Sequence, residues 1–217
     1  MSGTSNTSNP LASPQREHSG ATTYGKFEYQ YHWALCKALN LHNEGKEYVV
    51  FVEYHEDVIV GDSLDADQVQ FHFHQVKNYA GGPWKIKKII TRQKADGSKE
   101  KSSILAKMIS GVKGKPFYGR LLSLGLVNAT GFELELATAG LSLSTIFVDD
   151  LSPAAKAQLA AALKAEIGDD DIPGILCFIV SDLPTQRFQE TSIGHIAGCL
   201  ESKIQIAGIV QKAYIWL

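Results

Sequence analysis

The chain of 217 residues is long enough for one large domain or two small ones, and its 44% hydrophobic content supports a sizeable buried core. Three widely spaced cysteines argue against a disulfide framework and favour a reducing, cytoplasmic setting. No apolar run approaches the roughly 18 residues that a membrane span needs, which argues against a membrane protein. Residues 1–20 are rich in Ser, Thr, Asn and Pro, lack the apolar core of a signal peptide and are expected to be disordered.

The net charge of −2 conceals an uneven distribution of charged residues. The stretch from Lys77 to Arg120 holds 12 of the 21 Lys and Arg residues but only two of the 23 Asp and Glu residues. This stretch therefore has a charge of about +10, and the rest of the chain about −12. Such a division indicates a positive surface beside an acidic site, as in proteins that bind a polyanion. The alternative is a solvated loop whose lysines only aid solubility.

In chain order, the first expected element is a helix over residues 24–41, where apolar residues such as Tyr31 recur at helical spacing. Residues 48–60 and 68–77 are rich in β-branched and aromatic residues, which predicts a strand over each range. The acidic turn at residues 61–67 is expected to join these two strands into a hairpin.

The remainder of the chain alternates further helices and strands. Residues 80–83 break the chain, and a basic stretch with a turn at residues 96–98 follows. Ser152 and Pro153 are expected to begin a helix as its N-cap and first residue, and Gly168 to end it. Further helices are expected over residues 103–112, 152–167 and 191–206, and strands over 121–127, 141–148 and 174–181. Together these elements predict an α/β fold, a mixed sheet with helices around it.

Functional side chains gather on the hairpin. Because side chains on a strand alternate between its faces, Gln75 and Lys77 share one face of the second strand. On the first strand, Glu53, His55 and Asp57 are expected to share a face if no bulge or bend interrupts it. Pairing of the two strands can then bring Asp57 opposite Gln75 and Lys77, at one point on the sheet.

This set of residues suits metal-assisted hydrolysis of a phosphodiester bond. The Asp57 carboxylate, the Gln75 side-chain carbonyl and the Val76 backbone carbonyl are hard oxygen ligands of the kind that Mg²⁺ or Mn²⁺ prefers. Lys77 would orient the attacking water or stabilise negative charge on the reacting phosphate. Each residue also has a structural alternative: Asp57 at a strand end, Gln75 exposed on the hairpin, and Lys77 as a solvated edge charge.

A competing metal site would bind zinc through His72 and His74 with His55 or His32. No H-E-x-x-H motif or cysteine pair supports it, and the alternation of side chains places His72 and His74 on the face opposite Gln75. There is also no G-x-S-x-G motif for a serine nucleophile and no phosphate-binding G-x-x-x-x-G-K-[ST] loop.

The basic stretch offers side chains that could hold a nucleic-acid backbone on either side of such a centre. Residues 81–84 could form a loop that enters a groove, although a packed Trp84 is the alternative. The expected phosphate contacts are Lys85, Lys87, Lys88, Arg92 and Lys94.

The order of Asp57 and the motif Gln75-Val76-Lys77, after a helix with the motif F-E-Y-Q at residues 27–30, resembles the PD-(D/E)xK restriction-endonuclease-like superfamily. The motif G-x-F-x-Y-Q, followed by W-A-L and later E-x-x-E-D-V, is similar to the nuclease domains of bacterial anti-phage effectors. Such domains occur in CBASS effectors, in Lamassu systems and beside HerA-type helicases. The resemblance spans roughly residues 20–200.

The resemblance implies a restriction-endonuclease-like mixed β-sheet flanked by helices, with residues 21–217 forming the nuclease domain. It implies that Asp57 binds the metal, that Lys77 is the catalytic lysine and that Gln75 replaces the usual acidic residue. That replacement removes a negative charge and puts a second metal in doubt. Further candidates implied for the site are a polar helix residue, Gln30 or Glu28, and the carboxylate of Glu53.

The resemblance further implies a metal-dependent endonuclease that hydrolyses double-stranded DNA, largely regardless of sequence, in the bacterial cytoplasm. Because an unregulated nuclease would endanger its host, we expect a homo-oligomer. We also expect control by a sensor, an ATPase, an SMC-like or helicase partner, or a further C-terminal domain. The alternatives are a non-catalytic DNA-binding or assembly subunit and an enzyme that cleaves RNA.

Overall fold

The computed structural model describes residues 24–79, 81–92 and 101–204. The predicted disorder of residues 1–20, the turn at residues 96–98 and the side chain of Lys94 lie outside the described residues.

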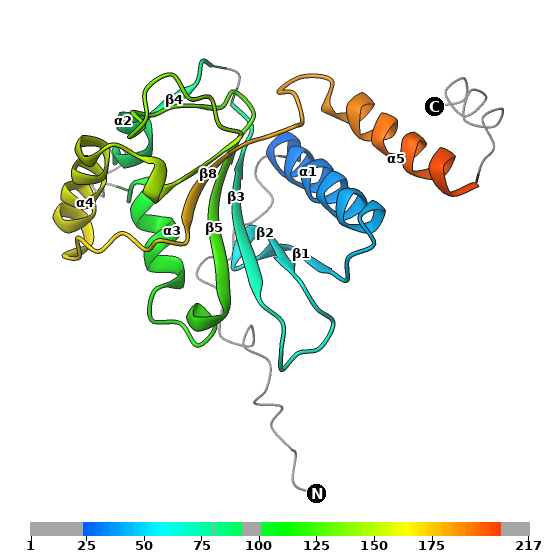
Figure 1. Cartoon of the computed structure of the whole chain (residues 1–217), viewed down its shortest axis with the longest axis horizontal. Coiled ribbons are helices and arrows are strands. Elements are labelled where there is room, and N and C mark those ends of the chain that lie inside the picture. The colour runs from blue at the N-terminus through cyan, green and yellow to red at the C-terminus, as the bar shows by residue number, and fades with distance from the viewer. Residues whose placement is uncertain (1–23, 80, 93–100, 205–217) are drawn as a thin grey trace, which may run out of the picture.

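A six-stranded mixed sheet forms the centre of the molecule (Figure 1). Its strands, in spatial order, are β1 (Val49–Tyr54), β2 (Glu56–Gly61), β3 (Phe71–Lys77), β5 (Leu121–Asn128), β8 (Leu176–Val180) and β7 (Thr145–Phe147). The central strands β3, β5 and β8 are parallel, whereas β1, β2 and β7 join the sheet antiparallel to their neighbours. A small second sheet pairs β4 (Trp84–Lys85) with β6 (Phe132–Glu133). The predicted α/β class with a mixed sheet is confirmed.

Helices cover both faces of the large sheet, and each face has its own apolar core (Figure 1). Phe71 and Phe73 of β3 lie in the core shared with α2, α3 and α4, whereas Val58 and Val76 lie in the core shared with α1. The helices are α1 (Tyr24–Asn43), α2 (Ile86–Ile90), α3 (Ile104–Val112), α4 (Pro153–Ile167) and α5 (Phe188–Ile204), with short 3₁₀ turns at Tyr118–Arg120 and Val148–Asp150.

The strand expected over residues 48–60 is instead two strands, so that prediction was wrong. The chain turns back at His55, which adopts a positive φ of 63°, and β1 pairs antiparallel with β2, Val52 opposite Val58. Glu53 also has a positive φ, of 57°. Side-chain alternation along one continuous strand therefore does not apply to Glu53, His55 and Asp57. The β-branched residues on the two sides of the turn pair with each other instead of extending one strand.

Helix α1 is present where expected, but its buried side differs from the one that its apolar spacing suggests. Tyr29, Trp33 and Cys36 are buried, whereas Tyr31 is 52% exposed and Leu35 39% exposed. Apolar side chains occur all around this helix, so spacing alone does not determine which of them face the sheet.

Capping residues and apolar runs in the sequence correctly predicted several other elements. Ser152 caps α4, its Oγ accepting a hydrogen bond from the Ala155 N–H at 3.1 Å, and Gly168 ends the helix with φ 76°. The strands expected over residues 121–127 and 174–181 are β5 and β8, whereas only Thr145–Phe147 forms a strand within residues 141–148. Helix α5 begins at Phe188, before the predicted start, and α2 was not predicted.

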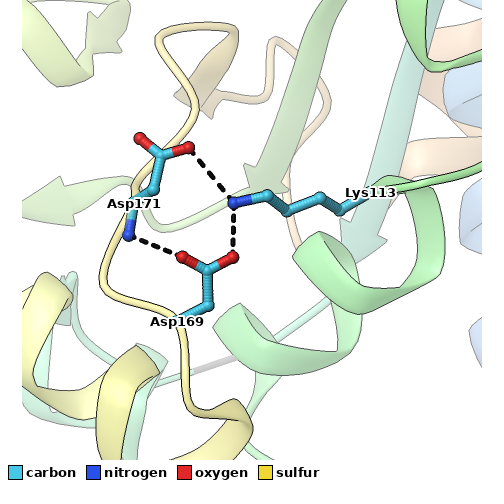
Figure 2. Close-up of polar contacts among 3 residues, drawn as sticks. All are labelled: Lys113, Asp169 and Asp171. Carbon is cyan, nitrogen blue, oxygen red and sulfur yellow. Dashed lines mark hydrogen bonds and ion pairs between the residues drawn. The ribbon is translucent and has the colours of Figure 1, made fainter.

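A partly exposed ion-pair cluster joins the end of α3 to the loop after α4 (Figure 2). The Lys113 ammonium contacts Asp169 and lies 3.1 Å from Asp171 Oδ2, while the Asp171 N–H donates to Asp169 Oδ1 at 3.0 Å. The hydrogen bond from Lys113 to Asp169 raises the pKa of Lys113 most, and the one to Asp171 raises it further. Exposed pairs of this kind add little stability, but they pair one lysine of the basic stretch with carboxylates.

Candidate active site

The antiparallel pairing of β2 with β3 positions Asp57 beside the end of β3. The pairs Val58–His74 and Ile59–Phe73 set the register, which extends to place Asp57 opposite Gln75. Asp57 Oδ2 accepts hydrogen bonds from the Val76 backbone N–H at 2.8 Å and from Lys77 Nζ at 3.2 Å. The structure therefore brings Asp57 to the segment from Gln75 to Lys77, as the predicted pairing of the two strands required.

Glu53 adds a second carboxylate beside Asp57, although it arrives there by the fold-back at His55 rather than along one strand. Burial, followed by the negative charge of Asp57, raises the pKa of Glu53, and the ammonium of Lys77 opposes that rise. Glu53 Oε1 is buried and has no hydrogen-bond partner in the described part of the chain. The Lys77 ammonium thus contacts Asp57 and acts on Glu53 through its charge.

Helix α1 contributes Gln30 to the same point. Gln30 Nε2 donates to the Val76 backbone oxygen at 3.3 Å, and its buried Oε1 has no hydrogen-bond partner among residues 24–79, 81–92 and 101–204. Glu28, the other helix candidate, instead accepts a hydrogen bond from Gln189 Nε2 of α5 at 3.2 Å. The structure therefore brings Gln30 to the site and turns Glu28 toward α5.

A cavity of about 360 Å³ opens at this end of β3. Its polar wall includes Gln30, Gln75, Lys77, Tyr79, Lys88 and Lys107. Among the described residues, three lysines and no carboxylate line it, so its interior favours an anionic occupant. Asp57 and Glu53 are not among the lining residues, although Asp57 contacts the Lys77 ammonium.

Sequence reasoning missed Lys107 and Tyr79 as cavity residues. Lys107 interrupts an apolar run of helix α3, in which its neighbours Ala106, Met108 and Ile109 are all buried. A lysine within such an apolar sequence indicated a special position, but the sequence did not show which surface α3 packs against.

The predicted phosphate contacts separate into different environments. Lys88 lines the cavity and Lys87 is exposed, whereas Lys85 forms an ion pair with Glu133 at 3.1 Å. Arg92 donates to the Ala165 oxygen of α4 at 3.2 Å and is not among the cavity residues.

The aromatic side chain of Trp84 is buried with 4% exposure, so it packs inside the protein rather than forming an exposed wedge. It contacts Tyr79 with ring centroids 6.0 Å apart and Phe132 with centroids 6.5 Å apart.

The histidines of the zinc alternative lie in different surroundings. His72 Nδ1 hydrogen bonds with Ser123 Oγ at 2.8 Å, His74 packs on Trp33, and His55 packs on Phe117. In the described part of the chain, no group of three or more His, Cys, Asp or Glu residues is placed to hold a metal ion. A metal at the end of β3 would therefore need amide or backbone oxygens beside the two carboxylates.

A family model described as Cap4, dsDNA endonuclease domain, matches residues 18–208. The chain belongs to this family. The match includes every element from α1 to α5 and the whole candidate site. The chain is thus a Cap4-type nuclease domain, a double-stranded DNA endonuclease of anti-phage defence, and the expected resemblance to CBASS effector nucleases is confirmed. No curated protein and no solved structure matches it. No helix in the described ranges is long and apolar enough to cross a membrane.

Proposed function

We propose that this Cap4-type domain cleaves DNA with a Mg²⁺ or Mn²⁺ ion held by Asp57, Glu53 and Gln75, and with Lys77 as its catalytic lysine. One observation supports this most directly: Asp57 Oδ2 joins the Val76 N–H and the Lys77 ammonium at the end of a cavity lined by cations. A lysine that contacts a carboxylate and also lines a cavity with two further lysines suits hydrolysis of a phosphodiester.

The donor atoms fit a hard divalent cation. Asp57 and Glu53 supply carboxylate oxygens, Gln75 an amide oxygen and Val76 a backbone oxygen. A buried carboxylate oxygen without a partner, such as Glu53 Oε1, is costly unless a cation or donor satisfies it. When bound, such an ion would polarise the phosphate and lower the pKa of a water molecule.

The protein's own groups would act as follows. Asp57 fixes the position of the Lys77 ammonium, which borders the cavity and would stabilise negative charge that develops on the phosphate. Gln30 holds the Val76 carbonyl through its Nε2 and so restrains the end of β3. The amides of Gln30 and Asn78 in the lining donate to backbone oxygens of the protein, which leaves the lysines to contact phosphates, so cleavage should depend little on DNA sequence.

We further propose that the domain acts in the bacterial cytoplasm, as part of a homo-oligomer or with a regulatory partner. A nuclease that cleaves without sequence preference would damage host DNA unless assembly or a partner controlled it.

Plasmid cleavage by wild type and Lys77→Ala, with Mg²⁺, with Mn²⁺ and with EDTA, tests the proposal. We expect Lys77→Ala to cleave about 10²–10³-fold more slowly, the loss typical of removing one group that stabilises transition-state charge. Its Tm should stay near that of wild type, because the Lys77 side chain is 32% exposed. Lys156→Ala is the matched control, since this lysine of α4 has a side-chain exposure of 37% and does not line the cavity.

Equal cleavage by Lys77→Ala and wild type, or full cleavage in EDTA, would contradict the proposal. Binding of DNA by wild type without cleavage, in each metal and oligomeric state, would favour the non-catalytic alternative.

A further inference from the structure

The cavity at the end of β3 contains two lysines that the proposed chemistry does not use. Lys88 of α2 and Lys107 of α3 line it together with Lys77 of β3. With a volume of about 360 Å³, the cavity has the size of sites that bind small organic ligands, so it has room for more than one phosphate group.

Lys88 is held by aromatic rings. Its Nζ lies 5.0 Å from the ring centroid of Tyr79 and 5.9 Å from that of Trp84, distances typical of cation–π contacts. Trp84 is buried and Tyr79 is 44% exposed, and both line the cavity with Lys88, so the ammonium is held against rings of the cavity wall. Aromatic faces restrain a lysine without neutralising its charge, unlike a carboxylate.

Other cations near this region have acidic partners. Lys85 pairs with Glu133 at 3.1 Å, Arg92 lies 3.9 Å from Glu166, and Lys113 contacts Asp169. No ion pair joins Lys88 to a carboxylate among the residues that the structure describes. The cavity therefore contains a positioned cation whose charge remains available to an incoming anion.

We propose that Lys88 and Lys107 form a second phosphate-binding subsite, which holds the DNA phosphate next to the one that reacts at Lys77. Lys77 comes from β3 and contacts Asp57, whereas Lys88 and Lys107 come from α2 and α3. In this proposal, the one cavity therefore binds two successive phosphates of one DNA strand. Tyr79 is the positioning residue of this subsite, because its ring restrains the Lys88 ammonium. The inference rests on the proposed function for the identity of the anion.

The test measures binding of a short fluorescent DNA duplex in EDTA, across a titration of KCl, so that cleavage does not interfere. Lys88→Met, Lys107→Met and the double variant are compared with wild type and with the control Lys156→Met. Each single variant should bind about three- to tenfold more weakly, the share of one phosphate contact in non-specific affinity. Because both lysines contact one phosphate, the double variant should reduce the slope of log K against log[KCl] by about 0.9, rather than by twice that value.

Tyr79 supplies a second, independent measurement. Tyr79→Leu should weaken binding and Tyr79→Phe should preserve it, because the ring rather than the hydroxyl faces Lys88. Wild-type affinity and salt slope in Lys88→Met and Lys107→Met, with both proteins folded, would refute the subsite. So would a slope reduction of about 1.8 in the double variant, which would mean two separate phosphates.

Failure of the subsite and failure of the proposed function give different results. If Lys77→Ala cleaves like wild type, but Lys88→Met loses affinity and the double variant loses slope, the catalytic proposal is wrong and the subsite is supported. If Lys77→Ala is inactive but the Lys88 and Lys107 variants bind like wild type, the subsite alone is wrong.

Discussion

We expect the buried imidazole of His74 to make the stability of this domain sensitive to mild acid. His74 lies on the α1 side of β3, packed edge-on against Trp33 with ring centroids 4.9 Å apart. It is 4% exposed, and neither ring nitrogen has a hydrogen-bond partner in the part of the chain that the structure describes. Burial lowers the pKa of His74 from 6.5 to about 3, and the positive charges of His72 and Lys37 act in the same direction.

The sign and size of the effect follow from this shift. In the unfolded chain His74 takes up a proton as the pH falls through 6.5, whereas the folded protein does not until about pH 3. The free energy of unfolding is therefore unaffected by protonation of His74 above pH 6.5, and it declines as the pH falls from 6.5 toward 3. Each pH unit in this range costs about 1.4 kcal/mol, so lowering the pH to about 5 costs about 2 kcal/mol. For a chain of 217 residues this corresponds to a loss of about 4–8 °C in Tm.

Thermal unfolding of wild type and His74→Phe between about pH 7.5 and pH 5, in EDTA, measures this contribution. Phenylalanine keeps an aromatic ring against Trp33 and does not titrate, so the variant should lose about 4–8 °C less than wild type over this interval. His42→Gln, which changes an exposed histidine at the end of α1, should retain the wild-type pH dependence. If wild type and His74→Phe lose stability in parallel, protonation of the buried His74 imidazole does not cause the loss of stability in acid.

Two further predictions concern packing and helix capping. Gly125→Ala should destabilise the domain by about 1–3 kcal/mol in urea unfolding, because a Cβ there would lie 2.8 Å from Ile179 Cδ1 and 2.9 Å from His74 Nδ1; an unchanged midpoint would show that the sheet yields easily at this point. Ser152→Ala should cost about 1 kcal/mol through loss of the cap on α4, and Ser152→Asp should retain most of it; equal stability of the Ala and Asp variants would contradict a capping role.

The parts of the fold that could be predicted are those fixed by local chemistry. Ser152, Pro153 and Gly168 define both ends of α4 by capping and by the left-handed conformation of the glycine. The turn at His55 could not be predicted in this way. No glycine or proline marks it, and a histidine with positive φ persists there only because β1 and β2 pair on its two sides.

In the candidate site, too, the features fixed by nearby residues could be predicted and those fixed by tertiary packing could not. The meeting of Asp57 with Lys77 could be predicted, because alternation and hairpin register depend only on residues close in sequence. Glu53 was named for the wrong reason, since it reaches Asp57 by pairing across a turn. The place of Lys107 could not be predicted, because it depends on how α3 packs against the end of β3, a long-range tertiary arrangement.

Positive charge along the sequence indicated the right kind of partner but did not identify the residues that face it. Lysines and arginines of the basic stretch that lie near carboxylates, such as Lys113 beside Asp169, are already compensated and offer little to a phosphate (Figure 2). The cavity at the end of β3 differs, because no carboxylate lines it among the described residues and the Lys88 ammonium there lies over the rings of Tyr79 and Trp84. Lys77 stands between this cationic lining and Asp57, so one side chain connects the acidic residues proposed to hold the metal with the surface proposed to hold the DNA.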